Sequence, residues 1–252
     1  MKKLLKSSLL TLASFALLTG ANAKTLENGV LKIATEGTYS PYSYHDKNDA
    51  LTGYDVEVAR EVAKKLNLKA EFVEAPWDAM LAAFDAGKAD VVFNQVSINE
   101  DRKKKYGMSV PYTMPYPVIV VHKDNNDIKN FADLKGKKSV HSATSNWAAI
   151  AEKNGATVVV ADGVSKGVEL IISKRADDTI NDNVTFYDYI KQRPNAPLKI
   201  AYTSNEPMPT AAIVKKGNTE LLEAINKALN ELKVEGKLKE ISVKYFGKDI
   251  SE

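Results

Sequence analysis

The residue whose type and position most clearly suggest binding chemistry is Arg102, within the stretch VVFNQVSINEDRKKKYGMSVPY. Val91–Phe93 is a short apolar run typical of a buried strand, and Asn94–Ile98 is the polar connection that leaves it. Asn99 is a candidate helix N-cap, so Arg102 falls in a first helical turn, where the helix dipole favours acids over cations. A cation in that place predicts a bound anion.

The anion that best fits Arg102 is a carboxylate. A guanidinium offers paired donors in the geometry that two carboxylate oxygens accept. The hydroxyl of Ser97 and free N–H groups at the helix start would add further donors. The alternative is that Arg102 merely begins the solvated basic run that continues to Lys105.

The segments that must position this receptor alternate between strand and helix patterns, which predicts an α/β fold with mostly parallel sheets. Ligands of open α/β sheets bind beyond the carboxyl ends of strands. Loops of this kind are predicted at Glu36–Tyr44, Asn94–Asn99, Ser142–Asn146 and Asn181–Asn183, two in each half of the chain. A ligand that touches all of them would lie between the halves, and the proline-marked crossings near 115 and 209 would act as hinges.

Residues 1–23 carry the pattern of a secretory signal: a lysine-containing start, an apolar core and the cleavage sequence Ala21-Asn22-Ala23. The lysines of this segment account for the formal net charge of +3, so the mature chain is formally neutral. Neutrality removes the main electrostatic argument for nucleic acid or anionic membrane as a partner. We therefore expect an exported protein, free in the periplasm, without a lipid anchor.

Nucleophilic and metal chemistry find little support in the sequence. The chain has no cysteine, and its histidines, His45, His122 and His141, show neither metal-ligand nor catalytic-triad spacing. We expect no cofactor and no metal.

Several motifs, in this order, resemble those of extracytoplasmic solute-binding proteins for polar amino acids, the receptors of ABC importers. They are Gly53–Ala59, Ser97–Arg102 with the later Ser109–Tyr112, Leu134–Lys137, and Arg175–Asp177 followed by Asp182. The resemblance covers essentially the whole mature chain. It implies a two-lobed periplasmic-binding-protein fold of type II, with mixed, mostly parallel sheets and a ligand cleft between the lobes.

The resemblance also implies domain boundaries. Lobe 1 would hold residues 24–114 and 210–252, and lobe 2, inserted into it, residues 115–209. The hinge crossings would lie near 113–118 and 206–212.

By the same resemblance, Arg102 is similar to the arginine that binds the ligand's α-carboxylate, assisted by Ser97 and Ser145 from opposite lobes. Asp182 matches the aspartate that receives the α-ammonium, although on the residues alone it is equally a helix cap. Tyr39 and Trp77 resemble the aromatic pair that encloses the ligand's aliphatic part, whereas Trp77 also fits a core stripe with Met80, Leu81 and Phe84.

The remaining predicted contacts concern the ligand side chain. Glu36 would favour a second positive charge or hydrogen-bond donors, and the segments around Thr144 and Asn181 most resemble cystine-binding members. The predicted polar lining comprises Glu36, Asn94, Gln95, Thr144, Asn146 and Asn181. We expect a monomeric, non-enzymatic receptor that delivers an amino acid, with cystine favoured, to a membrane permease.

Other functions fit the same pattern. Glutamine, histidine or arginine are alternative ligands. A periplasmic dehydratase of prephenate or arogenate is an alternative on the same fold, with Glu36 as its acid. A sensory or adhesive surface protein is a third.

Overall fold

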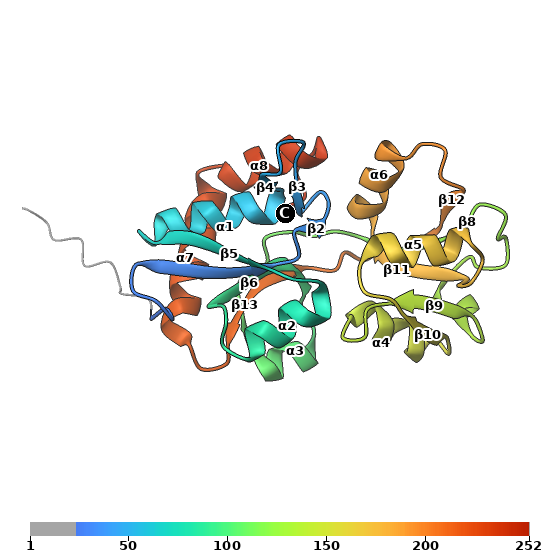
Figure 1. Ribbon diagram of the computed structural model, residues 1–252, viewed down its shortest axis with the longest axis horizontal. Coiled ribbons are helices and arrows are strands. Elements are labelled where there is room, and N and C mark those ends of the chain that lie inside the picture. Colours follow the sequence, from blue (N-terminus) through green and yellow to red (C-terminus); the bar gives the residue numbers. More distant parts are fainter. Residues whose placement is uncertain (1–23, 252) are drawn as a thin grey trace, which may run out of the picture.

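The computed structural model describes residues 24–251, which form two α/β lobes joined by two extended segments (Figure 1). The predicted secretory segment, residues 1–23, lies outside the described residues. Each lobe is built on one five-stranded sheet, with strand order β5-β1-β6-β13-β7 in lobe 1 and β10-β9-β11-β8-β12 in lobe 2. Lobe 1 also carries a small sheet of order β2-β3-β4.

Lobe 1 takes its elements from both ends of the described chain. They are β1 (Val30–Thr35), β2 (Thr38–Tyr39), β3 (Ser43–His45), β4 (Leu51–Thr52), α1 (Tyr54–Lys65), β5 (Lys69–Glu74), α2 (Trp77–Asp85), β6 (Val91–Ser97), α3 (Glu100–Lys105), β7 (Tyr106–Met108), β13 (Thr210–Lys215), α7 (Thr219–Val234) and α8 (Lys237–Phe246).

Lobe 2 is continuous in sequence. Its elements are β8 (Pro117–His122), the short 3-10 helix η1 (Phe131–Leu134), β9 (Lys138–His141), α4 (Asn146–Lys153), β10 (Thr157–Val160), α5 (Val164–Ile172), β11 (Asp178–Asp182), α6 (Asn183–Gln192) and β12 (Leu198–Thr203).

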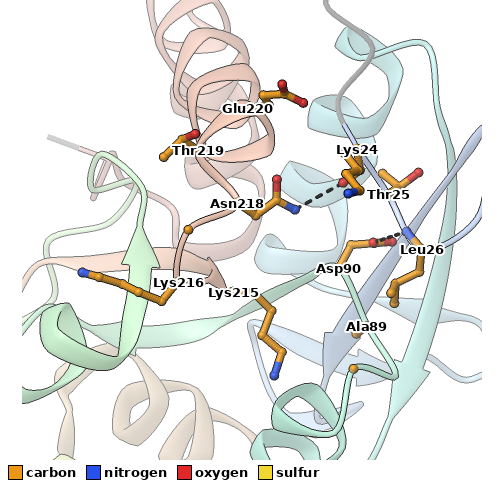
Figure 2. A pocket seen from close by; sticks show the side chains of 12 residues that line it. Lys24, Thr25, Leu26, Ala89, Asp90, Lys215, Lys216, Asn218, Thr219 and Glu220 are labelled. Carbon is orange, nitrogen blue, oxygen red and sulfur yellow. Dashed lines mark hydrogen bonds between the residues drawn. The ribbon is translucent and has the colours of Figure 1, made fainter.

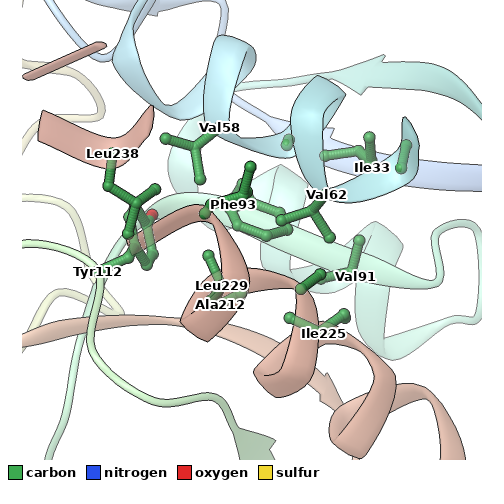
Figure 3. Close-up of a cluster of buried hydrophobic side chains, with 14 of the residues drawn as sticks. Ile33, Val58, Val62, Val91, Phe93, Tyr112, Ala212, Ile225, Leu229 and Leu238 are labelled. Atoms are coloured by element: carbon green, nitrogen blue, oxygen red, sulfur yellow. The ribbon is translucent and has the colours of Figure 1, made fainter. Parts of the chain in front are cut away.

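Apolar residues at helical spacing bury one face of each helix against a sheet. In lobe 1, Val58 and Val62 of α1 and Ile225 and Leu229 of α7 meet Phe93 of β6 in one fully buried cluster (Figure 3). The other face of that sheet is covered by α2. Lobe 2 repeats this layering, with α5 and α6 on one face and α4 on the other.

The segments that join the lobes run side by side. Tyr112 N–H donates to Thr210 O at 3.1 Å, and Thr210 N–H donates to Thr113 O at 3.0 Å. Met208 N–H donates to Pro115 O at 2.8 Å, so backbone bonds continue along the crossing. Backbone hydrogen bonds therefore hold the two crossing segments together between the lobes.

Two strands are longer than their apolar runs predict. β6 extends beyond Phe93 through the segment interpreted as a connection, because Val96 and Ser97 pair with β13. Similarly, β11 runs from Asp178 to Asp182 because every residue of it pairs with β8. In both cases the partner strand lies far away in the sequence, and no local pattern announces it.

Candidate functional site

A cavity of about 70 Å³ lies between the lobes, and residues from both lobes line it. The carboxyl ends of β1 and β6 and the start of α2 contribute from lobe 1. The start of α4, the end of β11 and the start of α5 contribute from lobe 2. Predicted site residues that line it are Glu36, Tyr39, Trp77, Asn94, Gln95, Ser145, Asn146 and Asn181.

The other predicted residues, Ser97, Arg102, Thr144 and Asp182, contact residues of this lining. Ser97 Oγ lies 3.4 Å from Asn146 Oδ1 across the lobes. Trp77 Nε1 donates to Thr144 Oγ1 at 2.9 Å, also across the lobes. Eight of the twelve predicted residues therefore line the cavity and the other four contact its lining, while Arg102 lines a second cavity of about 650 Å³ together with Thr144, Ser145 and Asn146.

Arg102 is a buried cation, and no carboxylate of residues 24–251 forms an ion pair with it. Its side chain is 9% exposed, and Nη1 donates to the carbonyl of Ser97 at 3.0 Å. The guanidinium carbon lies 5.3 Å from the ring centre of Trp77. Within residues 24–251, Nη2 is buried and has no hydrogen-bond partner. Burial lowers the pKa of Arg102 to about 10, because desolvation penalises its charged form.

The local structure explains why Arg102 points inward. Asn99 caps α3 by accepting from the backbone N–H of Arg102 at 2.9 Å. The predicted N-cap is thus present, and it occupies the backbone N–H of Arg102, so this one N–H group is not free for an anion. The lysines at 103–105 point outward, and Arg102 is the buried residue of α3. The guanidinium itself remains available.

Asp182 combines the two roles that the sequence leaves open. It caps α6, because Oδ1 accepts from the backbone N–H of Thr185 at 2.8 Å. It also faces lobe 1, where the Tyr39 hydroxyl lies 2.7 Å from Oδ2 and the Tyr42 hydroxyl 3.1 Å from Oδ1. Burial raises the pKa of both tyrosines well above their usual value, so they stay protonated donors.

Glu36 lies at the lobe 1 wall of the cavity. It is 8% exposed, and its Oε2 accepts from Asn94 Nδ2 at 2.6 Å. Asn94 Oδ1 in turn accepts from the backbone N–H of Glu36 at 2.9 Å. Burial raises the pKa of Glu36 to about 7, against the opposing effect of the Asn94 hydrogen bond. A cation placed beside Glu36 would lower that pKa again.

Gln95 connects the cavity to the hinge. Its Nε2 donates to the buried Asp55 at 2.7 Å, and its Oε1 accepts from Thr113 at 2.7 Å and from Thr210 at 3.1 Å. These threonines belong to the two different crossing segments. Gln95 adopts φ +50°, a conformation rare outside glycine, where β6 and β13 slip in register. Burial raises the pKa of Asp55 to about 7.

A further buried polar cluster in lobe 2 lies outside the cleft. Ser139 Oγ lies 2.8 Å from His141 Nε2 and donates to Asp178 Oδ1 at 2.5 Å. Burial lowers the pKa of His141 to about 3 and raises that of Asp178 to about 7. The serine lies between the acid and the imidazole, whereas a nucleophilic triad places the imidazole between them. This cluster is a polar element of the lobe 2 sheet.

A larger cavity, of about 470 Å³, contains none of the predicted residues. It lies at the N-terminal edge of lobe 1, where the chain enters β1 and α7 begins (Figure 2). Asn218 Nδ2 donates to Lys24 O at 3.2 Å, and the backbone N–H of Leu26 donates to Asp90 Oδ1 at 2.6 Å. These bonds hold the start of the described chain against lobe 1.

Residues 24–251 contain no group of three or more His, Cys, Asp or Glu side chains that could hold a metal ion. No helix in the same range is both long and apolar enough to cross a membrane.

Comparison with known proteins places the fold in a family. Residues 31–248 match the bacterial extracellular solute-binding proteins, family 3. The chain belongs to this family. A probable amino-acid ABC transporter-binding protein of Haemophilus influenzae is 45% identical, over 100% of both chains. The L-cystine-binding protein TcyA of Bacillus subtilis is 46% identical, over 91% of this chain and 86% of its own.

Among solved structures, the L-cystine solute receptor of Neisseria gonorrhoeae is 46% identical, over 89% of this chain and 95% of that one, with a TM-score of 0.59. That structure is in the unliganded open conformation. A modest score at such identity is what two similar folds give when their lobes stand at different angles. In this solute-binding protein the lobes are in direct contact, through Trp77 and Thr144 and through Tyr39 and Asp182.

The size of the cavity agrees with closely approached lobes. Ligand sites usually measure about 300–1,000 Å³, whereas this cavity measures about 70 Å³. In the structure as described, the cavity is therefore smaller than an ordinary site for an amino acid.

Four residues that line the cavity were not among the predicted contacts: Ser142, Trp147, Gly163 and Val164. Ser142 is the first residue of the predicted loop before α4, and Trp147 lies in the first turn of α4. Gly163 and Val164 begin α5, directly after β10. The rule that ligands meet the carboxyl ends of strands, applied to β10 as well, would have found the latter pair.

Proposed function

We propose that this protein is the amino-acid receptor of an ABC importer and that its ligand is L-cystine. The observation that carries the proposal is the buried guanidinium of Arg102, whose Nη2 lacks a partner within residues 24–251. An unpaired buried charge is costly, and a ligand carboxylate would remove that cost. The family match and the relatives named as amino-acid and L-cystine-binding proteins support the assignment.

In this proposal the two ends of the amino acid meet opposite charges on opposite lobes. Arg102 binds the α-carboxylate, and the hydroxyls of Ser97 and Ser145 donate to the same oxygens. Asp182 receives the α-ammonium, which replaces the hydroxyl of Tyr39 at Oδ2. Pairing both charges offsets the free-energy cost of removing the zwitterion from water.

The far end of the ligand lies near Glu36, whose carboxylate accepts from Asn94. Cystine carries a second ammonium and a second carboxylate, so its distal ammonium would pair with Glu36. Its distal carboxylate would meet amide donors from the polar lining, such as Asn146 or Asn181. Tyr39 and Trp77 flank the aliphatic and disulfide part.

Closure couples binding to transport. The ligand enters between separated lobes, which then bend about the proposed hinge crossings near 113–118 and 206–212 and enclose it. The closed receptor docks on a permease in the inner membrane. The proposed route to the periplasm is export through residues 1–23, and the N-terminal residue of secreted protein would be Lys24.

Intrinsic tryptophan fluorescence tests the ligand, because Trp77 and Trp147 both line the cavity. Purified protein is titrated with cystine, glutamine, histidine and arginine, and calorimetry measures stoichiometry. We expect one site per chain, with cystine bound most tightly. A response to none of these amino acids would refute the receptor assignment, whereas a preference for arginine or glutamine would refute cystine alone.

Glu36 provides one observation in favour of a second candidate, a dehydratase. Its pKa of about 7 leaves a protonated carboxyl available as a general acid in neutral solution. Incubation with prephenate or arogenate, followed by chromatography of the products, distinguishes the two. Turnover that disappears in Glu36→Gln would establish the enzyme.

A further inference from the structure

Asp78, in the first turn of α2, is not itself a predicted ligand contact, but it binds lobe 2 at Ala143 and at Thr144, a residue of the predicted lining. Its Oδ2 accepts from the backbone N–H of Ala143 at 3.0 Å. Its Oδ1 accepts from the backbone N–H of Thr144 at 2.9 Å and from the Thr144 hydroxyl at 2.5 Å. One lobe 1 carboxylate thus receives three donors from lobe 2.

All three donors belong to the loop before α4, which also supplies the cavity lining. Ser145, the next residue, caps α4 by accepting from the N–H of Trp147 at 3.2 Å, and it lines the cavity. Asp78 therefore binds the outer side of the loop whose following residues face the ligand site. The neighbouring Trp77 adds a cross-lobe bond to Thr144 at 2.9 Å.

These bonds depend on the approach of the lobes. Asp78 belongs to lobe 1 and its donors to lobe 2, so separation about the hinge breaks all three bonds at once. In open protein, water would solvate the carboxylate and the two N–H groups. The contact then contributes free energy to the closed arrangement and none to the open one, which is the requirement for shifting a two-state equilibrium.

We propose that Asp78 is a closure latch: it sets the lifetime of the closed, ligand-bound state without touching the ligand. This proposal rests on the receptor function for its biological meaning, but the latch can be observed apart from any ligand. Because the ligand is captured by open protein and released by reopening, loss of the latch speeds dissociation and does not slow association.

The test compares Asp78→Asn with the matched variant Asp85→Asn. Asp85 is at the other end of the same helix and pairs with Lys105 at 2.6 Å, entirely within lobe 1. Asparagine keeps the size of the side chain, but only its oxygen can accept a hydrogen bond. Its NH₂ group would face a backbone N–H that the second carboxylate oxygen of Asp78 accepts from. Dissociation of cystine is followed by stopped-flow tryptophan fluorescence.

Lobe separation is measured independently of binding. The chain contains no cysteine, so Lys88→Cys in lobe 1 and Glu152→Cys in lobe 2, both at exposed positions, can carry a pair of spin labels. Distances are recorded with and without cystine. If the wild-type protein binds no cystine, the cystine assignment fails, and the distance distribution without ligand still decides the latch.

We expect Asp78→Asn to release cystine about tenfold faster than Asp85→Asn, since charge-assisted hydrogen bonds are lost at a partly solvated site. We also expect a larger fraction of long label distances in Asp78→Asn, with circular dichroism equal to wild type. Equal dissociation rates and equal distance distributions in the two variants would overturn the proposal.

Discussion

Replacing Arg102 by methionine should have opposite effects on folding stability and on ligand affinity. The arginine side chain destabilises the ligand-free fold, whereas it strengthens binding of the ligand. The pKa of Arg102 falls from 12.5 to about 10 through burial, which corresponds to an unfavourable contribution of about 3 kcal/mol to folding. The hydrogen bond to Ser97 O at 3.0 Å offsets about 1–3 kcal/mol of this unfavourable contribution. Methionine removes both effects and fills most of the volume.

We therefore expect Arg102→Met to unfold at an equal or higher urea concentration than wild type. At the same time, its affinity for cystine should fall by about 2–5 kcal/mol, since the ligand carboxylate would lose the proposed guanidinium partner. Urea unfolding followed by circular dichroism measures the first quantity, and calorimetry measures the second.

Arg60→Met is the matched control. Arg60 makes the same kinds of contact as Arg102, with a donor bond to Leu51 O at 3.1 Å and a ring, Phe72, at 5.3 Å, but it is exposed on α1. It should change neither quantity by more than about 1 kcal/mol. If ligand-free Arg102→Met is clearly less stable than Arg60→Met, this refutes the inference that buried Arg102 lowers the free energy of unfolding. Unchanged affinity would refute its role as the carboxylate partner.

Three other predictions concern charge, pH and backbone. Asp182→Asn keeps an N-cap acceptor for α6 but loses the charge and one of the two oxygens that accept from Tyr39, Tyr42 and Thr185, so thermal stability should fall by about 1–3 kcal/mol while calorimetric affinity falls by about 2–5 kcal/mol; unchanged affinity would contradict the ammonium contact. Glu36 has a folded pKa of about 7 against 4.5 unfolded, so folded protein holds a proton that unfolded protein releases, and stability declines as pH rises between these values. Glu36→Gln should change this pH dependence by about 3 kcal/mol in urea unfolding at pH 4, 5, 6 and 7, on a background in which Asp55 and Asp178 act in the same direction as Glu36 and His141 in the opposite one; identical profiles would disprove the pKa shift. Gly53→Ala would place a methyl group 2.2 Å from Tyr42 O at φ +123°, so it should lower the stability in thermal unfolding by more than about 3 kcal/mol. Gly236→Ala, at φ +73° in open space, should lower it by about 1 kcal/mol. Equal losses would show that the backbone angle, and not the contact with Tyr42, determines the loss of stability.

Trp77 and Asp182 show how far local sequence patterns reach. For each, the pattern supports two roles, and the structure contains features of both. Trp77 packs against the cluster that includes Met80 and Phe84, and it also lines the cavity. Asp182 caps α6 and also faces the lobe 1 tyrosines. The two roles of each residue are compatible because helix starts and strand ends lie at the edge of a sheet, where the core adjoins the cleft.

Asn94 and Gln95 mark the limit of sequence reasoning. Two polar residues after an apolar run predict a loop, yet both are buried within β6. Their partners are Glu36, Asp55, Thr113 and Thr210, each remote in sequence. Whether such residues lie in a strand or in a loop depends on tertiary contacts, which the periodicity of the local sequence does not reveal.

The position of β13 in the lobe 1 sheet has a consequence for biosynthesis. This strand pairs with β6 and β7, but the chain reaches it only after all of lobe 2. During vectorial emergence of the polypeptide, lobe 2 can therefore collapse while lobe 1 still lacks an interior strand and the covering helices α7 and α8. The apolar faces of β6 and α1 stay uncovered until almost the whole chain is available, which makes the N-terminal half the part most in need of protection from aggregation.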